Sequence, residues 1–200
     1  RTMLLTEDHI AVQDAVRAYV QDRIAPQAAA WDKTHHFPRA ELKGLAELGC
    51  YGVAVPTAYD GAGLDYLALS LILEEIAAGD GATSTVISVN NCPVCSILMA
   101  WGNEAQKQQW LRPLARGEML GAFCLTEPHV GSDLASVRTR AGRRSDGWAI
   151  NGRKVWASGA HRAHYMIALV RTSPLGANRH EGLSQFLVDM QTPGLTVRPI

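Results

Sequence analysis

Few cysteines, few aromatic residues and a balanced charge characterise this sequence of 200 residues. Four cysteines in a chain of this length do not make a disulfide framework, which favours a reducing compartment. Basic and acidic residues number 19 each, so the formal net charge is zero and nothing indicates a nucleic-acid partner. No apolar run approaches the roughly 20 residues of a membrane span, so we expect no membrane partner.

The sequence pattern changes near residue 118. Hydrophobic residues make up 47% and charged residues 19%, which is ordinary for a globular protein with a sizeable core. Before residue 118 the apolar residues recur at helical spacing, and from Met119 onward they alternate as in strands. The sequence therefore predicts an α+β fold, with an all-α domain over residues 1–118 and a β-barrel or β-sandwich domain over residues 119–200.

Five helices are predicted in the first part, over residues 6–31, 38–48 with Gly49 after the last turn, 65–78, 82–100 and 103–116. Thr6 is the expected N-cap of the first helix, and Pro26 is expected to interrupt it. Pro38 is expected as the first residue of the second helix.

Three pairs of polar or thiol residues, two in the helical part and one in the β part, have an ordinary interpretation and a functional one. Glu74 and Glu75 are adjacent on a helix and do not face each other, which favours two solvated acids over a carboxylate dyad. Cys92 and Cys95 lack a second ligand pair, which favours ordinary buried thiols over a redox or zinc site. The histidines at 161 and 164, in the β part, have no acidic partner at ligand spacing, so we predict no metal site.

The helix over residues 82–100 is apolar all round, which predicts a buried position in the middle of a bundle. Asn90 and Asn91 interrupt its apolar sequence, and Pro93 is expected to break its hydrogen bonding. Such a polar break either borders a pocket or contains two satisfied amides at a kink, and the residues alone favour neither alternative.

The second part is predicted to hold strands over residues 120–126, 136–143, 147–150, 153–157, 164–171, 184–190 and 195–198. Turns are expected at residues 145–147 and at Asn151–Gly152, where an Asn-Gly pair is a strong hairpin signal. Residues 172–182 are polar and contain Pro174 and Gly176, which predicts a mobile surface loop.

Two segments of this β part carry the candidate chemistry. Residues 121–133 alternate as a strand and then end in a Pro/Gly loop with a hydroxyl group and a carboxylate at its tip. Residues 151–159 hold a turn, a short strand, a tryptophan and a hydroxyl group before glycine. Loops fixed at strand ends are common places for binding groups, so we expect a site where these two segments lie.

The two segments resemble the flavin-holding strands of the acyl-CoA dehydrogenase family. Phe123–Asp133 reads FCLTEPHVGSD and is similar to the family pattern [YF]-[CA]-[VLI]-[TS]-E-P-x-x-G-S-D. Residues 151–158 read NGRKVWAS and are similar to N-G-x-K-x-W-[IA]-[TS]. Two positions depart from the pattern, since the family usually has glycine and a small residue at 129–130 and threonine at Ser158. Ile87–Asn91 and residues 102–111 also match, and Val89–Asn91 is most similar to the short-chain members.

By resemblance, the cofactor is FAD, and its expected contacts are Phe123, Cys124, Leu125, Thr126, Gly131, Ser132, Trp156, Ala157 and Ser158. An isoalloxazine ring needs donors and acceptors at its pyrimidine edge and an aromatic or aliphatic wall, and these residue types can supply both. The resemblance also implies acyl-CoA contacts at Ser132, Asn91, Val94 and Cys95.

The implied reaction is α,β-dehydrogenation of an acyl-CoA thioester, with a hydride passing to flavin N5 and electrons leaving to an electron-transferring flavoprotein. The family's catalytic base is a glutamate of a C-terminal helical domain, which would begin after Ile200, so we predict no catalytic residue in this chain. This predicts that the chain is the N-terminal and middle part of a longer enzyme.

The resemblance further implies a homotetramer or homodimer and a cytoplasmic (bacterial) or mitochondrial-matrix location. Two alternatives stay open. One is an acyl-CoA oxidase or flavin monooxygenase on the same fold, and the other is a non-catalytic flavin-binding or interaction module.

Overall fold

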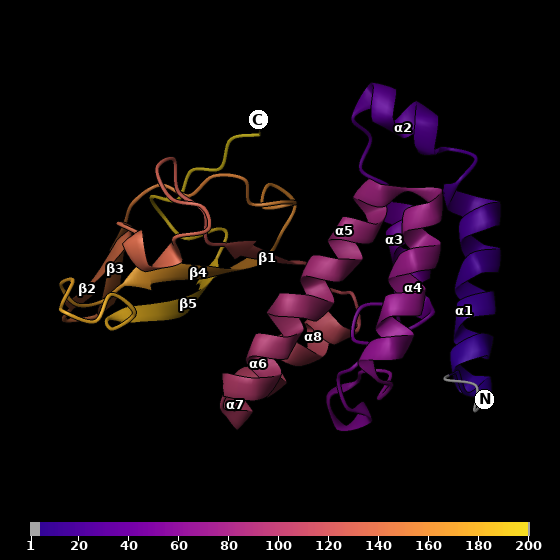
Figure 1. Ribbon diagram of the computed structural model, residues 1–200, viewed down its shortest axis with the longest axis horizontal. Helices are drawn as coiled ribbons and strands as arrows, with labels where there is room; N and C mark the ends of the chain where they lie inside the picture. Colours follow the sequence, from indigo (N-terminus) through magenta and orange to yellow (C-terminus); the bar gives the residue numbers. More distant parts are fainter. Residues whose placement is uncertain (1–4, 200) are drawn as a thin grey trace. The chain divides into compact units, whose positions relative to one another are not determined.

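The computed structural model describes residues 5–199, and it divides the chain into two compact units, Arg1–Met119 and Leu120–Ile200. The first unit is helical and the second is built on a β-sheet (Figure 1). The predicted α+β class is therefore confirmed.

Within residues 5–119, the described part of the first unit, the α-helices are α1 (Glu7–Tyr19), α2 (Ala28–Thr34), α3 (Arg39–Glu47), α4 (Tyr66–Gly79), α5 (Gly81–Val89), α6 (Ser96–Trp101), α7 (Glu104–Gln106) and α8 (Arg112–Ala115). Wider π-helical turns follow α1 at Val20–Ile24 and α7 at Lys107–Leu111. The core holds Val16, Ile24, Leu45, Ile72, Ile76, Ile87, Leu111 and Leu114, each 1% exposed or less.

The first predicted helix is interrupted as expected, but its parts have other bounds. Thr6 caps α1 by accepting a hydrogen bond from the His9 backbone N–H at 3.3 Å. The helical chain continues to Ile24, and α2 begins at Ala28, beyond Pro26. Pro38 is the N-cap of α3 and not its first residue, which is Arg39.

The prediction of two solvated acids in α4 is wrong for Glu75. Its side chain is 12% exposed and accepts hydrogen bonds from Arg17 Nη2 at 2.7 Å and Gln13 Nε2 at 2.8 Å. Because helical neighbours lie four residues apart, Glu75 stands beside the buried Leu71 and faces α1, whereas Glu74 is exposed. These contacts tie α1 to α4.

A kink separates α5 from α6, at the predicted place. Cys92 has extended backbone angles (φ −141°, ψ 105°) just before Pro93, since a residue before proline is disfavoured in the helical region. The whole segment Gly81–Trp101 is long and apolar enough to cross a membrane by length and composition, so the sequence-based statement about apolar runs was too strict. A buried core helix passes the same test, and here Asn90 and Asn91 are packed inside the helical unit.

Five strands form one sheet in the second unit: β1 (Gly121–Cys124), β2 (Arg140–Arg144), β3 (Gly147–Asn151), β4 (Tyr165–Arg171) and β5 (Leu183–Asp189). The order is β1-β4-β2-β3, and β5 pairs with β4. β1 runs parallel to β4, with Gly121 opposite Tyr165, and β5 runs antiparallel to β4. The sheet is thus centred on β4.

Three strand predictions need correction. Residues 153–157 and 195–198 are not in strands, and β2 begins at Arg140 and not at residue 136. Asn151–Gly152 is not a hairpin turn, because Asn151 ends β3 and the hairpin of β2 and β3 turns at residues 145–146 instead. Gly152 has a packing role, since an added Cβ would lie 2.6 Å from Thr139 Cα.

Candidate functional site

The two motif segments meet where β1 ends. The Val155 backbone N–H donates to the Thr126 carbonyl at 2.9 Å. The Lys154 ammonium donates to the Leu125 carbonyl, also at 2.9 Å. Residues 153–158 therefore follow the end of β1 without being a strand of the sheet, and their place depends on these two bonds.

Glu127 is a buried acceptor within this junction. Its side chain is 2% exposed, and it accepts from Lys154 Nζ at 2.8 Å, Arg138 N at 2.7 Å and Thr139 N at 2.9 Å. Burial alone would raise the pKa of this carboxyl, but the Lys154 ammonium, Thr139 and the Arg138 N–H together lower it to about 2. A carboxylate with so low a pKa is a poor general base, and its geometry is that of a structural anchor.

The loop after Glu127 is closed by two backbone bonds between Glu127 and Val130, of 2.9 and 3.0 Å. The departure from the family pattern at 130 has a packing role, because Val130 is buried in a cluster with Val137 and Leu169. His129 is exposed beside Glu127.

Gly131 and Ser132 form the exposed tip of this loop. An added Cβ at Gly131 would meet no atom within 4 Å, so the unit's own packing does not require glycine there. The next residue, Asp133, accepts two hydrogen bonds from Arg179, at 2.6 and 2.9 Å. The polar loop over residues 172–182 is therefore attached to the motif loop, a contact that sequence spacing could not indicate.

Trp156, Ala157 and Ser158 alternate between solvent and core. Ala157 packs against the buried cluster around Cys124 and Val170. Trp156 is 70% exposed and has φ +57°, in the left-handed region that an aromatic residue rarely adopts. Ser158 is exposed as well. An exposed tryptophan in a strained conformation, followed by an exposed hydroxyl group, is a feature of binding sites more than of cores.

The proposed contacts in β1 divide in a similar way. Cys124 is 3% exposed, and burial raises the pKa of its thiol to about 11, so its side chain belongs to the core. Phe123 and Thr126 are half-buried. In the described sheet β1 has a neighbouring strand, β4, on one side only, so Phe123 and Cys124 have a backbone edge that no strand pairs with, whereas the carbonyls of Leu125 and Thr126 beyond β1 accept bonds from Lys154 and Val155.

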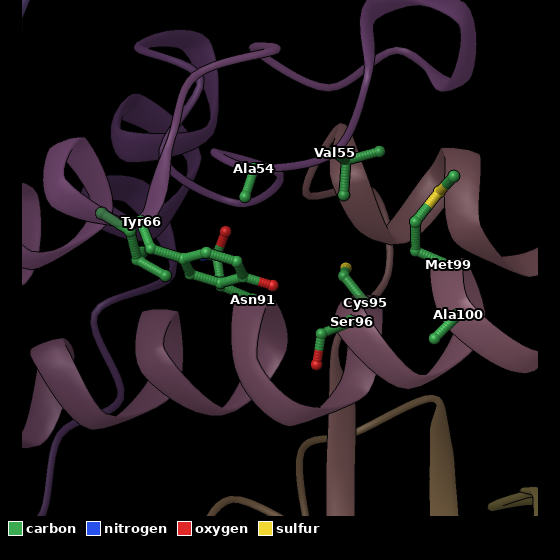
Figure 2. Close-up of a pocket in the computed structure, with 9 residues that line it drawn as sticks. Ala54, Val55, Tyr66, Asn91, Cys95, Ser96, Met99 and Ala100 are labelled. Atoms are coloured by element: carbon green, nitrogen blue, oxygen red, sulfur yellow. The ribbon is translucent and has the colours of Figure 1, made fainter.

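The helical unit holds a cavity of about 180 Å³ (Figure 2). Its lining residues are Ala54, Val55, Tyr66, Leu69, Asn91, Cys95, Ser96, Met99 and Ala100. Asn91 and Cys95, both predicted as substrate contacts, thus border one cavity. Val94 is 1% exposed and is not among the lining residues.

The Asn91 amide is engaged by backbone groups. Its oxygen accepts from the Val53 N–H at 2.8 Å, and its nitrogen donates to the carbonyls of Cys50 at 2.7 Å and Ile87 at 2.9 Å. Asn90 likewise donates to two backbone carbonyls, those of Tyr51 and Leu114. These contacts favour the interpretation of two satisfied amides at a kink, with the cavity as a second feature of the same place.

Sequence reasoning missed several residues of the two candidate sites. Met99 lies four residues after Cys95, beyond the kink, so extending the helical spacing from Cys95 would have found it. Tyr66 comes from another helix, and no local pattern indicated it. In the part of the chain described, no group of three or more His, Cys, Asp or Glu side chains could hold a metal ion.

Comparison with known families assigns both units. The family model described as acyl-CoA dehydrogenase, N-terminal domain, matches residues 6–118, and that described as acyl-CoA dehydrogenase, middle domain, matches residues 122–200. The chain belongs to the acyl-CoA dehydrogenase family. The resemblance inferred from the two motif segments is therefore confirmed.

Among similar proteins of the family, the rat mitochondrial short-chain specific acyl-CoA dehydrogenase is 38% identical over 96% of this chain and 46% of its own length. A Bacillus subtilis acyl-CoA dehydrogenase is 36% identical over 98% of this chain and 51% of its own. A Mycobacterium smegmatis glutaryl-CoA dehydrogenase solved in complex with FADH2 is 32% identical, with a TM-score of 0.90 over 98% of this chain and 49% of that one. This chain spans about half the length of the relatives it matches.

Proposed function

We propose that this chain is the N-terminal and middle part of an FAD-dependent acyl-CoA dehydrogenase. The observation that carries the proposal is the meeting of the two motif segments at the end of β1, with Trp156 and Ser158 exposed beside it. Family membership and a relative solved with FADH2 support it.

The residues present fit a flavin. The edge of β1 that does not pair with β4 would offer backbone groups at Phe123 and Cys124 to a pyrimidine edge, the Thr126 hydroxyl group would add a donor just beyond it, and Trp156 offers an aromatic wall. The open space at Gly131 lets a ligand approach the backbone beside the Ser132 hydroxyl group. Bound FAD would supply the hydride acceptor for α,β-dehydrogenation of an acyl-CoA thioester.

We assign the residues of the chain to binding and orientation. Backbone groups would make the contacts at Phe123, Cys124, Leu125 and Thr126. Ala157 would act by packing on the buried cluster, which fixes the positions of Trp156 and Ser158. Trp156 would pack on the ring, the Ser158 hydroxyl group would lie near N5, and Ser132 would bond a phosphate or carbonyl group. No residue here is proposed as the base, because Glu127 is buried, ion-paired and strongly acidic.

The acyl group is proposed to lie against the cavity of the helical unit, with Asn91 and Cys95 in its wall. Because the Asn91 amide is already bonded to three backbone groups, it would shape this wall and not bind the ligand. A short-chain substrate is supported by Val89–Asn91 and by the name of the rat relative. Val94 is retained only as packing behind the wall.

The test uses the full-length natural protein purified with FAD and titrated anaerobically with butyryl-CoA. Bleaching of the oxidised flavin band supports the proposal. A bound flavin that no acyl-CoA bleaches would instead favour a non-catalytic flavin module, and absence of bound flavin would refute the assignment of residues 123–132 and 156–158. Slow reoxidation in air, with fast transfer to an electron-transferring flavoprotein, would separate a dehydrogenase from an oxidase or monooxygenase. Sedimentation of the holoenzyme would test the proposed homotetramer or homodimer.

A further inference from the structure

The Glu127–Lys154 ion pair joins three segments that are distant in the sequence. Glu127 follows β1, and its carboxylate holds the backbone N–H groups of Arg138 and Thr139, just before β2. Lys154 follows β3 and bonds both the Glu127 carboxylate and the Leu125 carbonyl. Its side chain is 12% exposed and that of Glu127 is 2% exposed, so the two charges meet largely out of water.

This ion pair stands directly before the strained part of the site. Residues 153–158 lie outside the strands, yet Trp156 has φ +57° with its side chain 70% exposed. Such a conformation is energetically unfavourable and persists only where the surroundings determine it. The exposed ring makes few contacts of its own, so the determining contacts are those on either side, at Lys154, Val155 and Ala157.

A buried ion pair is weak evidence for stability, because desolvation opposes the attraction, whereas its geometric demand is strict. If Lys154 moves, the buried Glu127 carboxylate loses its ammonium partner at 2.8 Å and keeps the two backbone N–H donors, with His129 Nε2 3.5 Å away, so the pair has one favourable arrangement. That arrangement fixes Lys154, and the next residue, Val155, donates its backbone N–H to the Thr126 carbonyl.

We propose that the Glu127–Lys154 ion pair is a positioning device of the candidate flavin site, which fixes Trp156 and Ser158 relative to Thr126. Neither Glu127 nor Lys154 is a catalytic residue. Both act through the backbone of residues 125–126 and 154–158. This inference rests on the proposed function, because it concerns the same flavin.

The test compares Lys154→Met with the matched control Arg153→Met in the full-length holoenzyme. Arg153 is the neighbouring residue and is exposed, so its change removes the same charge outside the buried pair. The readouts are the FAD dissociation constant, the shape of the oxidised flavin spectrum and the flavin reduction potential. A residue that only stabilises the fold would lower the melting temperature of the apoprotein without moving the spectrum or the potential of the remaining holoenzyme.

We expect Lys154→Met to weaken FAD binding by about tenfold or more, the size of effect seen for residues that orient the ligands of a metal ion, and to change the spectrum and potential. Arg153→Met should leave the FAD dissociation constant within about twofold, and Lys154→Arg should restore part of the loss because the charge is kept. Unchanged FAD affinity and spectrum in folded Lys154→Met would overturn the inference.

A second variant covers the case in which Lys154→Met does not fold. The double variant Glu127→Gln, Lys154→Met leaves no unpaired buried charge, yet it also lacks the ammonium bond to the Leu125 carbonyl. Weakened FAD binding with an altered spectrum in the double variant supports the inference, and wild-type binding and spectrum overturn it. A wild-type protein that binds no FAD would overturn the proposed function together with this inference, whereas FAD binding unaffected by the variants would overturn this inference alone.

Discussion

Replacing Asn91 tests whether its amide holds the fold or binds a ligand. The amide satisfies three backbone groups, at Val53, Cys50 and Ile87, with donor–acceptor distances of 2.7–2.9 Å. Leaving one buried backbone group unsatisfied costs about 1–3 kcal/mol, so three groups at the low end of that range sum to roughly 3–5 kcal/mol. This is a large part of the total of about 5–15 kcal/mol for a typical domain.

Two substitutions separate the hydrogen bonds from the packing. Asn91→Leu keeps the branching and the number of side-chain heavy atoms but bonds none of the three groups, and Asn91→Ala additionally opens space next to the cavity of about 180 Å³. We expect both variants to lose about 3–5 kcal/mol of unfolding free energy, with the alanine variant losing the larger amount. Ser96→Ala is the matched control on the same cavity wall, where the hydroxyl contacts with the Pro93 carbonyl at 3.1 Å and the Cys92 sulfur at 3.8 Å are lost and about 1 kcal/mol is expected.

Urea denaturation followed by far-UV circular dichroism measures the free energy, and hydrogen exchange gives a local readout. The Val53 amide should exchange much faster in both Asn91 variants, because its acceptor is the Asn91 oxygen, and it should be unchanged in Ser96→Ala. A loss below about 1 kcal/mol with unchanged exchange at Val53, together with a raised KM for acyl-CoA, would refute the structural interpretation and restore Asn91 as a direct substrate contact.

Two further predictions concern the sheet unit. The pKa of Glu127 is lowered from an ordinary 4.5 to about 2, so ionised Glu127 contributes roughly 3 kcal/mol to the free energy of unfolding above pH 4.5, and this contribution is lost as the pH falls towards 2. Glu127→Gln should therefore destabilise the protein strongly at pH 7 and little near pH 2. Equal destabilisation at both pH values, measured by urea denaturation, would contradict this. Gly152→Ala should lower the free energy of unfolding by about 1–3 kcal/mol, and with it the thermal midpoint, because the added Cβ would meet Thr139. Gly142→Ala is the control, since its Cβ would have no atom within 4 Å, and it should lower the thermal midpoint little if at all. Equal midpoints for the two variants would show that the approach to Thr139 is not tight.

Local patterns were sufficient for most of the architecture. The change of period near residue 118 predicted helices followed by strands, and the Pro93 kink and the Thr6 cap could be read from single residues. The failures occurred where tertiary contacts override a local signal. Residues 153–157 alternate like a strand, yet they pair with no strand. They are held at the end of β1 by the bond from the Lys154 ammonium to the Leu125 carbonyl and by the bond from the Val155 N–H to the Thr126 carbonyl.

The same limit applied to charged residues. Glu75 and Glu127 look like other surface acids in the sequence, and their burial depends on cations 58 and 27 residues away, Arg17 and Lys154. Sequence separation of this size leaves no periodic signal. A family motif can indicate that Glu127 is invariant in a pattern, but only the structure gives the donors that make it an anchor.

The alternation of burial explains how one motif can serve both fold and site. Cys124 and Ala157 pack on the same buried cluster, while Trp156 and Ser158 next to Ala157 are exposed. A substitution of the inward-facing Ala157 would therefore also move the exposed Trp156 and Ser158, because they are its neighbours in the chain. Conservative changes at Cys124 or Ala157 should therefore displace Trp156 and Ser158 and, for the proposed flavin site, lower the FAD affinity measured by titration; an unchanged affinity would contradict this coupling.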